Sequence, residues 1–198
     1  MKYVGPILFM TAAAAADAGC VDPRGDYDAF GDRLVDAGAT VVDGPIQSTL
    51  PDVTGDWYMG VRPDLPEDRI MQLRVTFTFT PVTTNTGTLA FDGYALDLTT
   101  LAPIGDAFVD TGAAIGSDGR GDLDLVGMLP AAANPVSGSN AAVNAVLHAE
   151  LRAEDFVCGT VSGQAGALPL AGTTWAAARI TSDTLPALVW SCDQQPAP

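Results

Sequence analysis

The chain has 198 residues, 47% of them hydrophobic and 17% charged, and its formal net charge is −15. This length and apolar content are typical of one globular domain and exclude a disordered acidic tail. Because 24 acidic residues stand against 9 basic ones, no basic stripe is present to displace the counterions of phosphates, and we expect no nucleic-acid partner.

The first 19 residues have the pattern of a secretory signal peptide. Lys2 gives a positive start, residues 3–16 are apolar, and residues 17–19 form a short exit that ends in small residues. The apolar stretch is too short to span a bilayer comfortably as a helix, because about 20 residues are needed. We therefore exclude residues 1–19 from the fold and predict that the protein is exported.

The Ala-Gly-Cys sequence at residues 18–20 resembles the lipobox of bacterial lipoproteins. The resemblance implies that Cys20 becomes the first mature residue, carries acyl chains such as palmitate and anchors the protein to the cell envelope, at the outer membrane. Asp17 departs from this pattern, because a lipobox usually has an aliphatic residue there. Two alternatives stay open: an ordinary cleavage site at residues 16–18, which would give a soluble periplasmic or secreted protein, and an uncleaved anchor.

The composition after Cys20 divides the chain into further segments. Residues 20–51 alternate Gly, Pro and Asp with few apolar patterns, which is typical of a flexible tether. We predict a β domain over residues 52–193 and a disordered tail at 194–198. This layout resembles that of the uncharacterised small envelope lipoproteins of Gram-negative bacteria.

The most regular pattern in the chain is RIMQLRVTFTFTP at residues 69–81, where apolar and polar residues alternate. A period of two predicts a half-buried antiparallel strand. Shorter runs of this kind cover 56–61, 88–98 with a bulge or turn at Gly93, 107–115, 122–129, 155–163, 173–180 and 187–192. Together they predict an all-β fold, an antiparallel meander of about eight strands that closes into a barrel or a two-sheet sandwich. Residues 140–156 fit a strand or a helix, and we favour the strand.

The three cysteines of the chain support export. If Cys20 is lipidated, Cys158 and Cys192 remain and can pair in an oxidising compartment. The chain-entropy model gives such a disulfide a stabilisation of about 3 to 4 kcal/mol. We therefore predict that these two cysteines are bonded.

The sequence TGDWYMG at residues 54–60 resembles the Gly-x-Trp motif that begins the first strand of lipocalins, which are eight-stranded barrels that hold small apolar ligands. Gly55 and Trp57 match the motif, and Arg179 is the candidate for the arginine that packs over the tryptophan. The resemblance makes Trp57, Phe77, Phe79 and Arg179 candidate ligand-binding residues. The alternative is a tryptophan that plugs one end of any β-barrel or sandwich.

Aspartates alternate in DGRGDLD at residues 118–124, so Asp118, Asp122 and Asp124 are weak candidates for a calcium site. The segment does not fit the twelve-residue calcium loop with its terminal Glu. We predict no metal and no cofactor.

Catalytic patterns are scarce. His148 is the only histidine, Glu150 is its obvious neighbour on the same face of a strand, and no nucleophile elbow, phosphate loop or dinucleotide fingerprint is present. The favoured function is a non-enzymatic binding or structural module for a small apolar ligand or an envelope component, with no catalytic residue assigned. The alternative is a secreted hydrolase that uses carboxylates near His148. A pocket lined by the inward aromatic residues of 57–79 and free of clustered ionisable groups would favour the first, and two carboxylates facing His148 in a cleft would favour the second.

Overall fold

The structure is a computed structural model, and it describes residues 48–67 and 69–196. The predicted signal peptide, Cys20 and all of the predicted tether before residue 48 lie outside the described residues. In the described part, no helix is long and apolar enough to cross a membrane.

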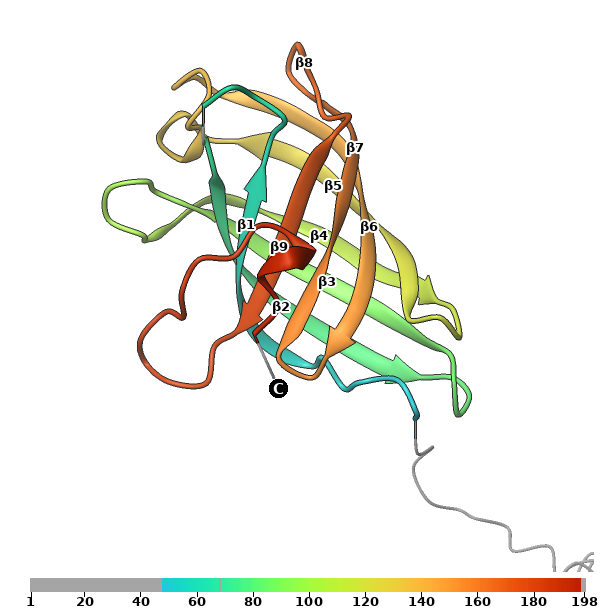
Figure 1. The fold of residues 1–198 in the computed structure, drawn as a ribbon. Coiled ribbons are helices and arrows are strands. Elements are labelled where there is room, and N and C mark those ends of the chain that lie inside the picture. The colour runs from blue at the N-terminus through green and yellow to red at the C-terminus, as the bar shows by residue number, and fades with distance from the viewer. Residues whose placement is uncertain (1–47, 68, 197–198) are drawn as a thin grey trace, which may run out of the picture. The chain divides into compact units, whose positions relative to one another are not determined.

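Eight long antiparallel strands form a sheet that is nearly closed into a barrel (Figure 1). The strands are β1 (Gly55–Arg62), β2 (Met71–Pro81), β3 (Gly87–Leu96), β4 (Pro103–Ile115), β5 (Arg120–Leu129), β6 (Ala141–Ala153), β7 (Phe156–Ala165) and β9 (Thr173–Arg179), and a short β8 (Leu168–Pro169) pairs with β7. Their order is β4-β3-β2-β1-β9-β7-β6-β5, so the last long strand returns to pair with the first. The predicted all-β antiparallel meander is therefore confirmed, and its sheet is nearly closed into a barrel.

The sheet is open between β4 and β5. These strands run side by side, but no ladder of backbone hydrogen bonds joins them among the described residues. The Gly116 N–H donates to the Arg120 carbonyl at the turn, and the Asp124 N–H donates to the Asp110 carboxylate over 2.8 Å. Between β4 and β5, the Asp110 carboxylate thus accepts a backbone N–H that a carbonyl of the neighbouring strand would accept in a regular sheet.

The strand assignments follow the alternation that the sequence shows. In β2, buried and less buried residues alternate over the first ten positions, as the period-two pattern predicts. Residues 141–153 form β6, so the strand that we favoured over a helix is confirmed. The pairing of β3 with β4 shifts its register between Gly93 and Ala95, next to the predicted irregularity.

One predicted strand is wrong: residues 187–192 form no strand. This segment packs on the outside of the barrel, where Val189 joins a small apolar cluster with Phe156, Cys158 and Ala176. The segment comes so close to β1 that a Cβ on Gly60 would lie 2.4 Å from the Val189 carbonyl oxygen. Its apolar residues therefore serve burial on the outer face and not strand pairing.

The disulfide between Cys158 and Cys192 is present, with the two Cα atoms 5.2 Å apart. It fastens the C-terminal segment to β7. A short 3-10 helix (Cys192–Gln194) follows, and the Gln194 side chain accepts from the Trp190 N–H and the Ser191 N–H. Gln194, the first residue of the predicted disordered tail at 194–198, therefore belongs to this hydrogen-bonded 3-10 turn.

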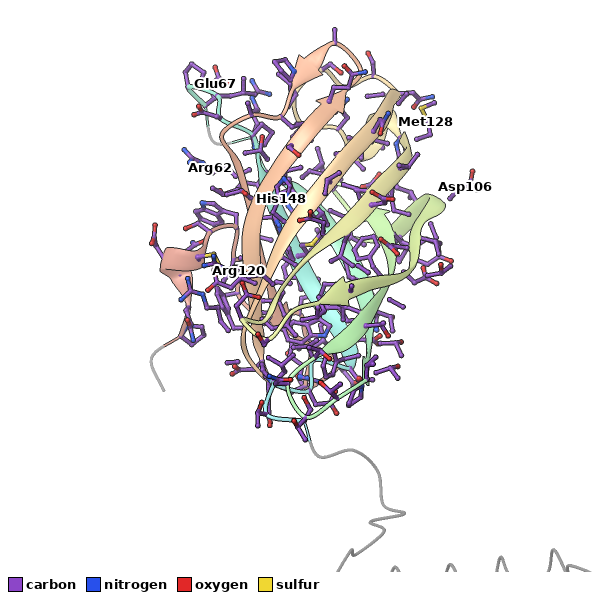
Figure 2. All side chains as sticks on the ribbon, turned by 90° about the vertical axis from the view of Figure 1, so that its right-hand side faces the viewer. Arg62, Glu67, Asp106, Arg120, Met128 and His148 are labelled. Carbon is purple, nitrogen blue, oxygen red and sulfur yellow. A yellow bond between two sulfur atoms is a disulfide. The ribbon has the colours of Figure 1, made fainter. Side chains whose placement is uncertain are left out.

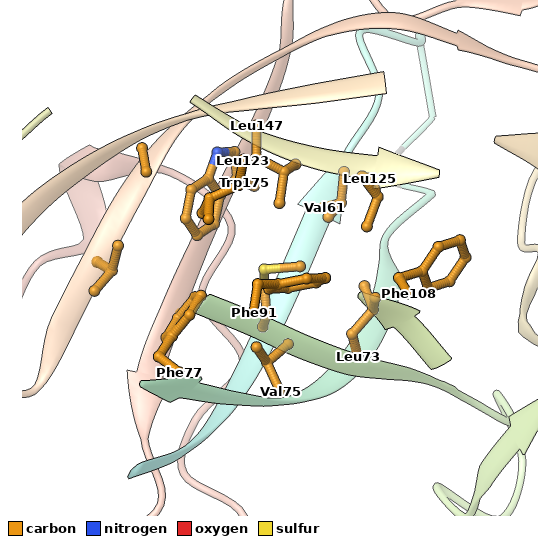
Figure 3. Close-up of a cluster of buried hydrophobic side chains, with 14 of the residues drawn as sticks. Val61, Leu73, Val75, Phe77, Phe91, Phe108, Leu123, Leu125, Leu147 and Trp175 are labelled. Carbon is orange, nitrogen blue, oxygen red and sulfur yellow. The ribbon is translucent and has the colours of Figure 1, made fainter. Parts of the chain in front are cut away.

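The core lies inside the barrel (Figure 3). Inward residues of β2 and β3 face those of β5, β6 and β9 across the interior. The largest fully buried side chains are Trp57, Trp175, Phe77, Phe91, Phe108 and Phe156, the last of which belongs to the outer cluster. The ordered structure begins before residue 52, since Thr49 bonds to the Thr84 carbonyl and Leu50 packs against the core.

Candidate functional site

One end of the barrel is closed by a tryptophan and an arginine. Trp57 is fully buried near the start of β1, and its indole N–H donates to the Val53 carbonyl over 2.9 Å. The guanidinium of Arg179, at the end of β9, lies 4.8 Å from the centre of the Trp57 ring. A cation over an aromatic face is attracted by the ring quadrupole. The arginine that the Gly-x-Trp resemblance implies is therefore in contact with this tryptophan.

Arg179 also joins three chain segments at the closed end. Its side chain donates to the carbonyls of Glu154, Thr54 and Asp52 over 2.6, 2.5 and 2.7 Å. The Thr54 N–H donates to the Asp52 carboxylate, and this bond lowers the pKa of Asp52. The hydrogen bonds that the Arg179 side chain donates here all go to carbonyls of the chain, and its charge also acts on the Asp52 carboxylate, so the residue acts here as a structural tie.

The opposite end of the barrel contains a pocket of about 440 Å³. Its wall comes from the end of β1, the start of β2, the end of β5, the start of β6, the end of β7 and the loops beyond them. The lining residues are Val61, Pro63, Met71, Leu125, Leu129, Asn134, Pro135, Val136, Ser137, Asn140, Ala141, Val143, Val161, Ala165, Gly166, Ala167, Leu168 and Leu170. None of these has an ionisable side chain. The volume lies within the range of about 300 to 1,000 Å³ that is typical of small-molecule sites.

The loop between β5 and β6 covers part of this pocket, and Asn134 holds its shape. The Asn134 amide donates to the Ser137 hydroxyl and to the Ser139 carbonyl, and its oxygen accepts from the N–H groups of Val136 and Ser137. The polar capacity of this buried side chain is used within the loop. The pocket is therefore apolar even where an amide lines it.

The four ligand-binding candidates from the sequence do not line this pocket. Trp57 and Phe77 are fully buried, Phe79 is buried, and Arg179 is at the closed end. Trp57 and Phe77 pack against each other at the closed end, with their ring centres 5.7 Å apart. The pocket is lined instead by mostly aliphatic residues at the ends of the strands and in the loops. The Gly-x-Trp motif gave no indication of these residues.

A second, polar hollow of about 330 Å³ lies on the outside of β5, β6 and β7, beside His148. Figure 2 labels His148 and Arg120, two of the residues that line it. The His148 Nδ1 atom is 2.7 Å from the Asp122 carboxylate, and the Nε2 atom is 2.9 Å from the Ser162 hydroxyl. Glu150 does not bond to His148. Its carboxylate pairs with Arg120 and Arg152 instead, over 3.3 and 2.9 Å.

The three calcium candidates do not converge. Asp118 accepts the Arg120 N–H in the turn before β5, Asp122 contacts His148, and Asp124 lies two residues further along the same strand. Among the described residues, no group of three or more His, Cys, Asp or Glu side chains is placed to hold a metal ion.

Comparison with known proteins adds no assignment to this geometry. No family model matches the chain, and neither a curated protein nor a solved structure matches it. The two hollows and the contacts around them are therefore the features of this chain that bear on its function.

Proposed function

We propose that this β domain binds a small, uncharged, apolar ligand, without chemistry at that ligand, in the pocket at the open end of the barrel. The observation that carries the proposal is the 440 Å³ volume with no ionisable residue in its lining. Burying an apolar ligand stabilises a complex by about 25 cal/mol per Å² of surface removed from water. A charged group in this pocket would have no partner and would be costly to bury.

The test is a titration with a neutral, environment-sensitive dye, N-phenyl-1-naphthylamine. We expect saturable fluorescence enhancement with the wild-type protein and displacement of the dye by long-chain alcohols. Ala141→Phe places a ring in the pocket lining and should weaken dye binding about tenfold or more, since 1.4 kcal/mol is a factor of ten. Ala142→Phe, the next residue of β6, is exposed and is the matched control.

Two results would contradict this proposal. One is the absence of saturable binding by the wild-type protein. The other is equal affinity of the two phenylalanine variants, because the dye would then bind outside the barrel.

We further propose that the protein is exported and anchored through acylated Cys20. The Cys158–Cys192 disulfide supports export, since such bonds persist in oxidising compartments. Cys20 lies outside the described residues, so this proposal depends on the sequence. Mass spectrometry of the N-terminus of protein recovered from a Gram-negative host tests it. A diacylated or triacylated Cys20 is the expected result, and an unmodified terminus at Gly19 would refute the anchor.

The carboxylate-dependent hydrolase has less support. Such a mechanism needs two carboxylates that face the reacting centre. At His148, Asp122 is in contact, and the charge of Glu150 is compensated by two arginines. The binding module is therefore our first proposal.

A further inference from the structure

Three outward-facing side chains on three adjacent strands form a connected cluster. Asp122 of β5 is directly opposite His148 of β6 in the strand register, and Ser162 of β7 is opposite Val146, two residues before the histidine. Because side chains on one face of neighbouring strands lie within reach of their diagonal neighbours, the histidine ring meets both partners. The pocket at the open end shares none of these residues.

The hydrogen bonds determine where the proton of the neutral ring lies. An ionised carboxylate can only accept a hydrogen bond, so the Nδ1 atom of His148 carries the proton that points to Asp122 over 2.7 Å. The Nε2 atom is then an acceptor, and the Ser162 hydroxyl donates to it over 2.9 Å. This protonation state is the one that a general base needs to activate a serine.

Stability does not require this arrangement. The side chains of His148 and Asp122 are 43% and 69% exposed, and ion pairs at such exposed positions contribute little to stability. Water could satisfy both ring nitrogens equally well. A chemical role therefore explains the ordered Ser-His-Asp contacts at this exposed position better than a stabilising role does.

We propose that Ser162 is a nucleophile for acyl transfer from carboxylic esters, with His148 as its general base and Asp122 as the positioning residue. The Ser162 oxygen attacks the ester carbonyl, and its proton moves to the Nε2 atom of His148. The carbon–oxygen bond to the alcohol then breaks, and the alcohol leaves with the proton from His148. Water, activated by the same histidine, hydrolyses the acyl-serine and releases the acid.

The surroundings restrict the substrate to esters that react at an open surface. Two amide side chains, Asn144 and Gln164, are paired in register next to the Val146–Ser162 pair and are exposed. Their N–H groups, together with the hydroxyl of Thr160, which is paired with His148, are the side-chain donors in register for the negative charge that develops on the carbonyl oxygen. The 330 Å³ hollow on the other side of His148 contains Arg120, which is paired with Glu150, and Asp122 as a second acid, so an ester without an anionic group suits it better.

The test is covalent labelling of the full-length protein with a fluorophosphonate, followed by peptide mass spectrometry. Ser162 attacks phosphorus, fluoride leaves, and the serine proton passes to His148. We expect labelling at Ser162, no labelling at the exposed Ser182, which hydrogen-bonds Thr184 and no histidine, and no Ser162 adduct in Ser162→Ala. His148→Gln should slow labelling about 10²-fold, within the range of general-base catalysis.

The role of Asp122 has its own measurement. Because His148 is the only histidine, imidazole nitrogen NMR signals report its protonation without ambiguity. Asp122→Asn should shift the ring from the Nδ1-protonated form, slow the labelling and leave the thermal midpoint within a few degrees. Hydrolysis of uncharged 4-nitrophenyl esters should show the same ranking of variants.

Equal labelling of Ser162 in the wild type and in His148→Gln would overturn the proposal, as would labelling of Ser182 at the rate of Ser162. No Ser162 adduct in folded wild-type protein would overturn it too. All three results leave the dye-binding test of the barrel pocket unaffected.

Discussion

Removal of the disulfide should strongly destabilise the domain. Cys158 and Cys192 are 34 positions apart, and closing a loop of that length lowers the entropy of the unfolded chain by an amount worth about 3.8 kcal/mol at 25 °C. For a domain of this size, each kcal/mol shifts the thermal midpoint by about 2 to 4 °C. The double variant Cys158→Ala/Cys192→Ala should therefore unfold about 8 to 15 °C below the parent. Alanine suits these positions because Cys158 is fully buried in an apolar cluster.

The measurement is thermal and urea unfolding in a Cys20→Ser background, which removes the only other thiol. A reductant should destabilise the parent by the same amount and leave the double variant unchanged. A decrease of less than about 1 kcal/mol in the parent's free energy of unfolding on reduction would refute this prediction. Other contacts would then hold the ends of the loop together in the unfolded chain.

Three further predictions concern the closed end, the sheet and acid stability. Arg179→Met should lower the free energy of unfolding by about 2 to 4 kcal/mol in urea, because three carbonyls lose a charged donor, and Arg179→Lys should recover only part of it. Gly159→Ala should prevent normal folding, as judged by circular dichroism, since its Cβ would lie 1.8 Å from the His148 carbonyl oxygen. The Thr76 hydroxyl and then the Arg74 guanidinium lower the pKa of Asp56 from 3.8. The folded state therefore favours the ionised carboxylate of Asp56. Its contribution to the free energy of unfolding is full above about pH 3.8 and is lost as the pH falls through the lower pKa of the folded state. The free energy of unfolding of Asp56→Asn should therefore depend less on pH in that window.

Period-two alternation was sufficient to predict most of the fold. Residues 71–81 alternate because one face of β2 is buried and the other exposed. The same pattern resolved residues 141–153 as a strand. The strand predicted at residues 187–192 is wrong because an apolar run indicates that a segment is buried, but it does not indicate whether the segment pairs in the sheet or packs on its surface. In this chain the run covers the outside of β7 and β9.

The two hollows were harder to predict, for different reasons. Sequence patterns identify Trp57 and Phe77 as inward-facing, but they do not show where a barrel is packed and where it is open. The partners of His148 depend on the register of β5 and β7 against β6. That register sets Asp122 and Ser162 beside the ring, whereas sequence proximity suggested Glu150.

The pairing of the first strand with the last has a consequence for synthesis. Arg179 bonds to the Thr54 carbonyl across 125 positions of chain, so β1 has no partner on one side until β9 has been made. At about 5 to 20 residues per second, that edge waits for roughly 6 to 25 s. During this time the chain presents an unpaired edge and an unfilled interior, the features that favour aggregation. Synthesis rate and access to chaperones should therefore affect the yield of this protein more than that of a domain built from local contacts.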